Sequence, residues 1–406
     1  MSQDDLSPAT HILRDLIRCP SVTPEEGGAL TVLQQKLEAL GFTVSRRMAK
    51  APNTPDVENL YARLGTASPN LCFAGHTDVV PTGDETQWTT PPFDGAIRDG
   101  EMFGRGAVDM KGGIACFLAA VQDHLAKGKP MPGSISFLIT GDEEGPAING
   151  TKAILDALVE EGEQIDACVV GEPTNPDVIG DAIKIGRRGS VSGTVTVTGV
   201  QGHAAYPHLA DNPARGITMV CHALMDAPYD NGTDNFQPTN LEVTSIDMAN
   251  PAFNVVAGDA TARFNVRFND TWTADTIKQE IERRLDEAAK TEGLRKPLPA
   301  GPRPPITWRV DYTERPSHVF LTKDEKLIAS LSKAVEAVTG HTPELSTGGG
   351  TSDARFIKDV CPVVEFGLVG QTMHQIDERV ALCDLDTLTA IYGQFLETYF
   401  SDAVHA

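Results

Sequence analysis

Short apolar runs separated by helical stretches are the feature that most restricts how this chain can fold. Four runs have the length and composition expected of strands buried on both faces: LCFAG (71–75), SISFLIT (134–140), DACVVG (166–171) and VVEFGLVG (363–370). Helical patterns lie between them, notably at 114–128 and 151–162. This alternation of strand and helix predicts a mixed, mostly parallel α/β sheet with helices on both faces.

The pattern changes near residue 187. The segments that follow predict, in order, a strand, a helix, two strands, a helix and a strand at 191–200, 212–227, 241–248, 261–269, 273–293 and 306–312. That order describes a small α+β sandwich. The α/β pattern resumes after about residue 316. We therefore expect one domain formed by residues 1–186 and 316–406, with an inserted domain at 187–315 and a Pro-rich loop at 296–305 near its end.

Length and charge narrow the function. A chain of 406 residues exceeds the usual size of a single hydrophobic core, which agrees with two domains. The formal net charge is -22, whereas binding to nucleic acid or to an anionic membrane needs clustered Lys and Arg. A small-molecule substrate is the better expectation.

Cysteine usage and the N-terminus predict a cytoplasmic protein. The seven cysteines are dispersed and form no C-x-x-C pair, so neither a disulfide framework nor a thiolate zinc site is favoured. The first 20 residues are polar and acidic, unlike a secretory signal peptide, and no apolar stretch has the length of a membrane span.

Acidic or imidazole side chains follow the C-terminal end of every one of the four apolar runs. They are His76 and Asp78, then Glu143 and Glu144, then Glu172, and finally His374. A fifth acidic position, Asp109, lies in the Gly-rich turn GRGAVDMKGG just before a predicted helix. Open α/β sheets bind ligands at the carboxyl ends of their strands, so these residues mark the candidate site.

A group of acids this close together needs cations, because neighbouring carboxylates repel one another. Carboxylate and imidazole ligands without thiolate suit zinc, cobalt or manganese. By ligand count, His76 and Glu172 could hold one ion, Glu144 and His374 a second, and Asp109 could bridge the two. Each ion would then have three protein ligands and an open position, as in a catalytic zinc site.

Other interpretations have less support. A single His at a strand end, or two adjacent Glu in a loop, is more often a solvated or structural residue, and only the coincidence at four strand ends favours function. The pattern G-x-G-x-x-D at 104–109 lacks the third Gly of a dinucleotide fingerprint, so we reject a Rossmann site. Neither a G-x-S-x-G elbow nor a phosphate-binding P-loop motif occurs.

These motifs carry a resemblance that spans nearly the whole chain. GHTDVVP, GRGAVDMKGG, DEEG, GEPT, GVQGHAAYPHLADNP, GGGTSDARF and MHQIDE together resemble the dinuclear-zinc aminoacylase and carboxypeptidase superfamily. Within it, IGRRGS (185–190), GHAAYPHLADNP and GGTSDAR are most similar to the succinyl-diaminopimelate desuccinylase family. The resemblance implies a zinc aminopeptidase-like fold with an inserted lid and dimerisation domain. The Pro-rich loop at 296–305 departs from the family by its length.

The resemblance also implies roles for the residues at the strand ends. Two Zn²⁺ per subunit, which Co²⁺ can replace, would be bound by His76, Asp109, Glu144, Glu172 and His374, with Asp109 bridging. Glu143 would be the general base; spacing alone cannot distinguish it from Glu144. Asp78 would accept a hydrogen bond from the His76 imidazole, which fixes its tautomer. The Asp109–Met110 peptide bond is expected to be cis.

The implied reaction is hydrolysis of N-succinyl-LL-2,6-diaminopimelate to succinate and LL-2,6-diaminopimelate, in lysine and peptidoglycan biosynthesis. Arg187 and Arg267 could offer forked donors to the carboxylates of this substrate, whereas a structural role is favoured for Arg188. By resemblance, the pocket would also be lined by Ser190, Tyr206, Asn254, Gly350 and Thr351.

The resemblance further implies a homodimer formed through the lids, in which His203 reaches the active site of the partner and stabilises the oxyanion. From the residues alone, a histidine that caps a turn is the simpler interpretation of His203. Two rival functions remain open. One is acetylornithine deacetylase or another N-acyl amino acid amidohydrolase, and the other is a non-catalytic metal-binding homologue.

Overall fold

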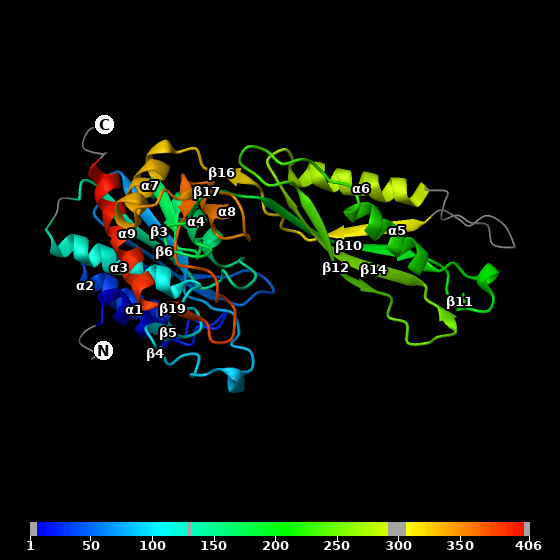
Figure 1. The fold of residues 1–406 in the computed structure, drawn as a ribbon, viewed down its shortest axis with the longest axis horizontal. Coiled ribbons are helices and arrows are strands. Elements are labelled where there is room, and N and C mark those ends of the chain that lie inside the picture. Colours follow the sequence, from blue (N-terminus) through cyan, green and yellow to red (C-terminus); the bar gives the residue numbers. More distant parts are fainter. Residues whose placement is uncertain (1–5, 129–130, 291–305, 402–406) are drawn as a thin grey trace. The chain divides into compact units, whose positions relative to one another are not determined.

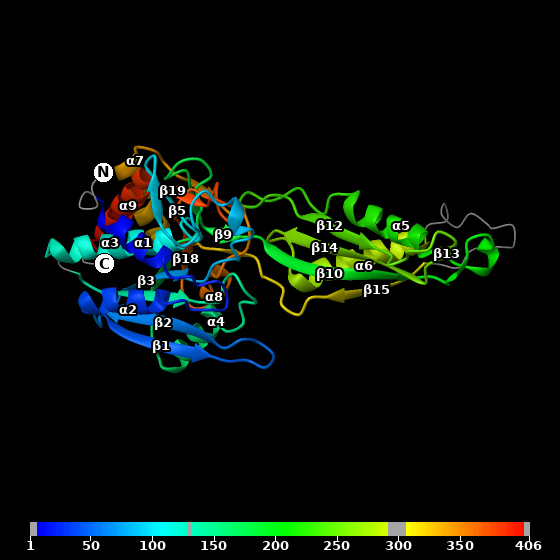
Figure 2. The same cartoon turned by 90° about the horizontal axis from the view of Figure 1, so that it is seen from below.

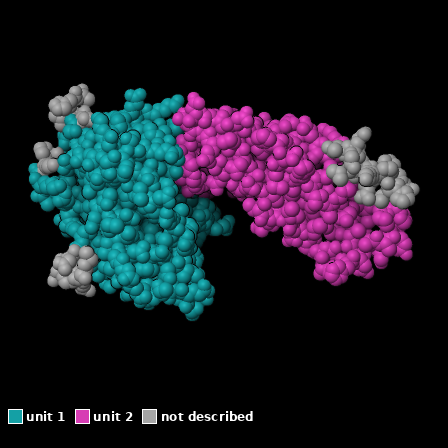
Figure 3. All heavy atoms as spheres, in the orientation of Figure 1, with its two compact units in different colours: residues 1–186, 321–346, 352–406 teal, residues 187–320, 347–351 magenta. Residues whose placement is uncertain are grey.

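The computed structural model describes residues 6–128, 131–290 and 306–401. It divides into two compact units, shown in different colours in Figure 3. Residues 1–186, 321–346 and 352–406 form the first, here called the α/β unit. Residues 187–320 and 347–351 form the second, here called the inserted unit. The predicted Pro-rich loop at 296–305 lies outside the described residues.

An eight-stranded sheet forms the centre of the α/β unit (Figure 1). Its order is β1 (Thr43–Ala49), β2 (Val57–Leu64), β6 (Ser134–Thr140), β3 (Asn70–His76), β7 (Ala167–Val170), β18 (Val363–Glu365), β8 (Ala182–Lys184) and β17 (Glu344–Ser346). The four central strands, β6, β3, β7 and β18, are parallel to one another. They are the four apolar runs of the sequence, so the predicted mostly parallel sheet is confirmed.

One of these strands is shorter than predicted. β18 ends at Glu365, whereas the apolar run continues to residue 370. The chain leaves the sheet there because Gly367 lies against the turn that follows β7, and its main-chain oxygen accepts a hydrogen bond from Asn175 Nδ2 at 2.7 Å. The residues beyond Glu365 stay buried, because Phe366 and Leu368 belong to the core of the α/β unit and Phe366 N still donates to the main-chain oxygen of Val170 at 2.9 Å.

Helices cover both faces of the sheet (Figures 1 and 2). They are α1 (Pro8–Ile17), α2 (Ala29–Ala39), α3 (Lys111–Ala126), α4 (Thr151–Glu160), α7 (Glu325–Thr339), α8 (Ala354–Ile357) and α9 (Leu382–Ser401). Alternate residues of β3 face opposite sides: Leu71 and Phe73 join the core formed with α1, α2, α3, α7 and α9, whereas Cys72 does not. Phe73 stacks on Phe117 of α3 with ring centroids 4.5 Å apart. In the described part of the chain, no helix has both the length and the apolar character needed to cross a membrane.

Shorter elements complete the α/β unit. β4 (Ala96–Arg98), β5 (Glu101–Phe103) and β19 (Arg379–Ala381) form a small antiparallel sheet, and a 3₁₀ turn occupies Glu85–Gln87. The chain crosses between the two units within β9 (Gly186–Arg187) and β16 (Phe320–Leu321), and again before and after residues 347–351.

The inserted unit is an antiparallel sheet covered on one face by two helices. The sheet order is β12 (Asn240–Asp247), β14 (Asp259–Phe268), β10 (Gly189–Thr198) and β15 (Thr307–Tyr312), and the helices are α5 (Pro213–Met225) and α6 (Ala274–Lys290). Strand, helix, strand, strand, helix and strand follow in the predicted order. Burial alternates along β10 and β14, so one face packs on the helices and the other is polar. A short pair, β11 (Gly202–His203) with β13 (Val255–Val256), and a 3₁₀ turn at Pro207–Leu209 lie beyond β10.

Candidate metal centre

Parallel strands deliver the predicted site residues to one edge of the sheet. His76 is the last residue of β3 and pairs in register with Thr140, the last residue of β6. β7 runs parallel beside β3 and ends at Val170, two residues before Glu172. The segments that follow these strands therefore emerge at a common edge, as the sequence predicts.

Two glycines allow the loops at this edge to approach one another. A Cβ on Gly113, in the first turn of α3, would lie 2.4 Å from the main-chain oxygen of Gly171. A Cβ on Gly367 would lie 2.4 Å from the main-chain oxygen of Glu172. The turn that carries Glu172 is thus held between the start of α3 and the segment after β18, a fit that excludes any larger side chain. This packing brings Asp109, just before α3, next to Glu172.

Asp109 lies between two imidazoles. Its Oδ1 is 3.1 Å from His76 Nε2, and its Oδ2 is 3.1 Å from His374 Nε2. On the first side, His76 Nε2 is 3.8 Å from Glu172 Oε1; on the second, His374 Nε2 is 2.8 Å from Glu144 Oε1. The structure therefore brings together all five residues expected as ligands, in two halves that share Asp109.

The two halves differ in exposure. The side chains of His76 and Glu172 are 1% and 12% exposed, whereas that of His374 is 49% exposed. His374 lies in a tight turn with φ of 62°, a left-handed conformation that residues other than glycine seldom adopt and that is found at functional sites. The peptide bond between Asp109 and Met110 is cis, as the resemblance implies. The His374 half is thus the more open side of the cluster.

Burial and charge perturb the ionisation of this cluster. Hydrogen bonds with Asp109 and Glu144 raise the pKa of His374 to about 10. Burial, and then the charges of Asp109 and Glu143, raise the pKa of Glu172 well above its ordinary value. Burial likewise raises the pKa of Glu143 to about 8. Burial thus disfavours the charged forms of Glu143 and Glu172, and the neighbouring carboxylates favour the charged form of His374.

The chemistry of the donors fits divalent metal ions. Among the described residues, the groups with ligand atoms within 4.8 Å of one another are His76 with Asp109 and Glu144, and His76 with Glu143 and Glu172. All donors are imidazole nitrogens and carboxylate oxygens, which suits zinc and similar ions. Positive charge at this position would also relieve the repulsion among the acids. The residues therefore form a candidate metal site.

Asp78 makes a different contact from the one expected. His76 Nδ1 lies 2.8 Å from the main-chain oxygen of Asp78 and 3.7 Å from its carboxylate, so the imidazole donates to the carbonyl. The carboxylate instead accepts hydrogen bonds from the main-chain N–H groups of Glu143, at 3.2 Å, and Glu144, at 3.0 Å. The expectation of an imidazole–carboxylate bond is wrong, because these two donors lie closer to the carboxylate. The carbonyl still fixes the tautomer, leaving Nε2 directed at Asp109.

Sequence reasoning missed other buried acids, three of which lie in the motifs quoted above. Asp142 is 2% exposed and accepts from the main chain at Ala147, Ile148 and Asn149, which folds the loop that carries Glu143. Asp353 is 4% exposed, and its charge contributes to the raised pKa of Glu143. Glu378 is 1% exposed. Asp142, Asp353 and Glu378 lie in the motifs DEEG, TSDAR and MHQIDE, respectively, and this was the only feature of the sequence that could have indicated them.

Four of the residues expected to line the pocket form a basic cluster in the inserted unit. Ser190 and Arg267 are cross-strand partners on the polar face of the sheet, and Arg267 Nη1 donates to Thr351 Oγ1 at 3.2 Å. Arg187 Nη1 donates to the main-chain oxygen of Gly348 at 3.1 Å. Burial, and then the charges of Arg188 and Arg187, lower the pKa of Arg267. Such crowded guanidinium groups can bind an anion. Gly350 adjoins Thr351 in the same segment.

The other three expected residues lie elsewhere in the inserted unit. The main-chain oxygen of Asn254 accepts from the main-chain N–H of Ala204 at 2.9 Å, and the rings of His203 and Tyr206 are 5.5 Å apart. β10 runs from Gly189 to Thr198 between this group and Ser190, and ten residues at about 3.3 Å each span roughly 30 Å. His203, Tyr206 and Asn254 therefore do not share a pocket with Ser190 in one copy of this unit.

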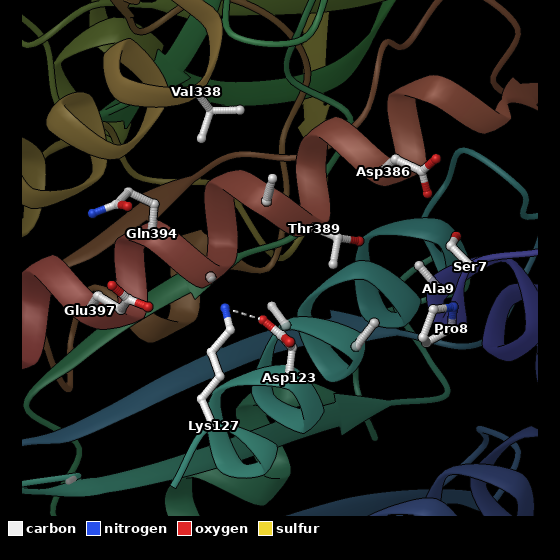
Figure 4. Close-up of a pocket in the computed structure, with 14 residues that line it drawn as sticks. Ser7, Pro8, Ala9, Asp123, Lys127, Val338, Asp386, Thr389, Gln394 and Glu397 are labelled. Atoms are coloured by element: carbon white, nitrogen blue, oxygen red, sulfur yellow. Dashed lines mark ion pairs between the residues drawn. The ribbon is translucent and has the colours of Figure 1, made fainter. Parts of the chain in front are cut away.

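A pocket of about 490 Å³ lies at a different place in the α/β unit, among α1, α3, α7 and α9 (Figure 4). Its polar residues include Asp123, Lys127, Asp386 and Glu397, and Lys127 pairs with Asp123 at 2.6 Å. Its lining contains neither histidine nor cysteine, and none of the expected site residues. This pocket is separate from the metal centre.

Comparison with known families identifies the chain. Residues 72–398 match the model of Peptidase family M20/M25/M40. The chain belongs to this family. M20 membership makes it a peptidase or amidohydrolase, and it agrees with the candidate metal site at the strand ends.

Solved structures share this fold over nearly the whole chain. An M20 family metallo-carboxypeptidase, Sso-CP2 from Sulfolobus solfataricus, matches with a TM-score of 0.77 and 16% identity over 98% of this chain and 100% of that one. Human carnosine dipeptidase 1 matches with a TM-score of 0.74 and 18% identity over 97% of this chain and 96% of that one. The YXEP protein of Bacillus subtilis, described as a dinuclear metal binding peptidase, matches with a TM-score of 0.68 and 15% identity over 97% of each chain. At these identities the likeness establishes the fold alone.

Proposed function

We propose that this protein is a dinuclear zinc amidohydrolase that cleaves N-succinyl-LL-2,6-diaminopimelate into succinate and LL-2,6-diaminopimelate, a step of lysine and peptidoglycan biosynthesis. The observation that carries the metal-dependent part is the position of Asp109, one oxygen toward His76 and the other toward His374. The substrate rests on the resemblance of three motifs and on the basic cluster of the inserted unit.

His76 and Glu172 would hold one ion, Glu144 and His374 the other, and Asp109 both. When bound, two such ions lower the pKa of a water molecule between them and polarise the scissile carbonyl. The protein orients one of the imidazoles for this role: the main-chain oxygen of Asp78 accepts from His76 Nδ1, which directs Nε2 toward Asp109, where it could bind a metal.

Glu143 would act as the general base. It belongs to the group formed with His76 and Glu172, and the carboxylate of Asp78 holds its main-chain N–H. Burial raises the pKa of this carboxyl, which makes its ionised form a stronger base than an exposed carboxylate. Glu143 would take a proton from the attacking water at its carboxylate and deliver it to the departing amine.

The basic cluster supports an anionic acyl group. Arg187 and Arg267 carry planar guanidinium groups, with Ser190 and Thr351 beside Arg267 as neutral donors. A succinyl group ends in a carboxylate that such donors can pair, whereas an acetyl group has none. This difference favours the desuccinylase over acetylornithine deacetylase, the nearest alternative.

Comparison of N-succinyl and N-acetyl substrates tests the proposal. We expect the succinyl substrate to have a kcat/KM at least ~10²-fold higher, because a site built to pair a carboxylate rejects an analogue that lacks it. Arg267→Met should lower kcat/KM for the succinyl substrate and narrow this ratio. Arg309→Met, a control on the same sheet whose guanidinium is 69% exposed, should leave it unchanged.

Each alternative gives a different result in this assay. Preference for the acetyl substrate would identify a deacetylase. Turnover of neither substrate by protein that holds two zinc ions per chain would support a non-catalytic homologue, or an amidohydrolase with another substrate.

A further inference from the structure

The carboxylate of Glu378 accepts four hydrogen bonds from the segment that leads to Asp109. Oε1 accepts from the main-chain N–H groups of Val108, at 2.9 Å, and Asp109, at 3.2 Å. Oε2 accepts from the main-chain N–H of Gly106 at 3.0 Å and from Arg105 Nη1 at 2.8 Å. Glu378 is 1% exposed, so water does not compete for these donors.

Glu378 follows His374 by four residues, so it joins the two loops that carry Asp109 and His374. Main-chain contacts reinforce the join, because the main-chain oxygen of Glu378 accepts from Gly104 N at 2.9 Å. Arg105 extends it: Nη1 donates to the main-chain oxygen of Gln375 at 3.0 Å, and Nη2 to that of Pro81 at 3.3 Å. Pro81 belongs to the loop that follows His76, so three loops at this edge of the sheet are linked.

We infer that Glu378 is a positioning residue that sets the distance between Asp109 and His374, and with it the geometry of the more open half of the metal centre. It touches neither substrate nor metal and acts through the main chain of Asp109. This inference rests on the proposed metal centre. The alternative is a buried carboxylate that stabilises the loops but has no effect on metal binding.

The chemistry of the four donors makes Glu378→Gln the decisive variant. Glutamine keeps the shape but replaces one acceptor oxygen by an NH₂ group. That group would face N–H donors on either side of the carboxylate, so two of the four hydrogen bonds are lost and the segment before Asp109 must shift. The pair formed by Asp109 and His374 would then no longer be held at its present separation.

The test measures zinc binding by competition with a chromogenic chelator, and the absorption spectrum of the Co²⁺-substituted protein. We expect Glu378→Gln to bind the second Zn²⁺ equivalent ~10- to 100-fold more weakly, the usual effect of removing a residue that orients a metal ligand. The Co²⁺ bands should change in shape. In the succinyl assay kcat should fall while KM stays within about threefold.

Glu163→Gln is the matched control. Glu163 also accepts from several donors in the α/β unit, among them Tyr61 at 2.9 Å and Arg63, but it lies near the opposite end of the strands, beside Asn70 at the start of β3. This variant should lower the melting temperature and leave both zinc affinities and the Co²⁺ spectrum unchanged. The same result for Glu378→Gln would overturn the inference.

Two further outcomes are separable. If wild-type protein itself fails to bind two zinc ions, the proposed metal centre is wrong, whatever the variants do. If Glu378→Gln does not fold, Arg105→Lys replaces it: lysine keeps one donor for Glu378 but not the fork that reaches Gln375 and Pro81. A several-fold weaker second zinc site in Arg105→Lys supports the inference, and unchanged affinity contradicts it.

Discussion

Glu143 and Glu144 are adjacent in the chain, and both have a carboxylate oxygen within 4.8 Å of His76, but their other neighbours differ. Glu144 also groups with Asp109 and lies 2.8 Å from His374, whereas Glu143 groups with Glu172. We expect Glu143→Ala to keep two metals per chain and to lose ~10²–10⁴-fold in turnover, the usual effect of removing a general base. Glu144→Ala should retain one metal. Elemental analysis of the two purified variants decides; a Glu143 variant short of metal beside a replete Glu144 variant would mean that the roles are reversed.

The positions of acidic and imidazole residues after the predicted strands located the candidate site, but they could not show which way each side chain points. Adjacent glutamates differ only in direction, so their separation toward His374 and His76 emerges from the folded loop. The contact of the Asp78 carboxylate was predicted wrongly because main-chain N–H groups compete with the imidazole and leave no trace in the sequence. Glu378 was missed for the same reason. Of the four groups that donate hydrogen bonds to its carboxylate, three are main-chain N–H groups and one is the Arg105 side chain.

At the scale of elements, Asp230 links the loop after α5 to the end of β14. Its Oδ1 accepts from Gly232 N at 2.8 Å and Asn269 Nδ2 at 2.6 Å, and its Oδ2 from Trp272 Nε1 at 2.8 Å. Burial alone would raise the pKa of Asp230, but these hydrogen bonds outweigh it and lower the pKa. A carboxyl group whose pKa is lower in the folded state stabilises the fold at pH values above its pKa in the unfolded chain. This stabilisation is lost as the pH falls through its pKa in the folded protein.

We therefore expect Asp230→Asn to reduce the free energy of unfolding by about 1 kcal/mol at pH 7, and by less as the pH falls below ~4. Urea denaturation at a series of pH values measures the difference. The control is Asp311→Asn in the same unit, where the carboxylate is 60% exposed and a change of under ~0.5 kcal/mol is expected at every pH. A loss for Asp230→Asn that grows toward low pH contradicts the sign of the pKa shift.

Elements whose residues follow one period were predicted best. β10 and β14 alternate strictly, and the structure places them as paired strands. The start of α3 was predicted three residues late, at 114 instead of Lys111, because Gly112 and Gly113 disfavour a helix. Both glycines serve close tertiary contacts, Gly112 against Ala107 and Leu368 and Gly113 against Gly171, which a local pattern does not contain.

For the whole molecule, a distant segment completes the inserted unit. Residues 347–351 group with residues 187–320, and the bond from Arg267 to Thr351 is part of the reason. Such a return of the chain depends on side-chain pairing across many residues and is not readable from local pattern. We propose that the α/β unit is the catalytic domain and that the inserted unit is the lid.

The separation of His203 from Ser190 within the inserted unit suggests a role for a second copy of the chain. The main-chain N–H of Ala205 donates to His203 Nδ1 at 3.0 Å, so the neutral ring carries its proton on Nε2 and offers a donor from an exposed position. We propose that His203 stabilises the oxyanion in the active site of the partner subunit of a homodimer. Tyr206 and Asn254 would accompany it.

Mixing two inactive variants tests this proposal. Glu143→Ala and His203→Ala should each turn over poorly alone, because both sites of a two-fold dimer are equivalent. After co-refolding, about half of the dimers are mixed and one of their two sites is intact, so activity should return to roughly a quarter of wild type. Mixed dimers that stay inactive, with their composition verified by mass, would mean that His203 does not act across the dimer.

Crystals grown with zinc test the metal centre most directly. Anomalous difference maps collected on both sides of the zinc absorption edge should show two peaks per chain, one beside His76 and Glu172 and one beside His374 and Glu144, with Asp109 between them. Each ion should lie about 2.0–2.2 Å from its nitrogen and oxygen ligands. A map with no peak among these residues, or with zinc bound only elsewhere on the chain, would contradict the proposed dinuclear hydrolase.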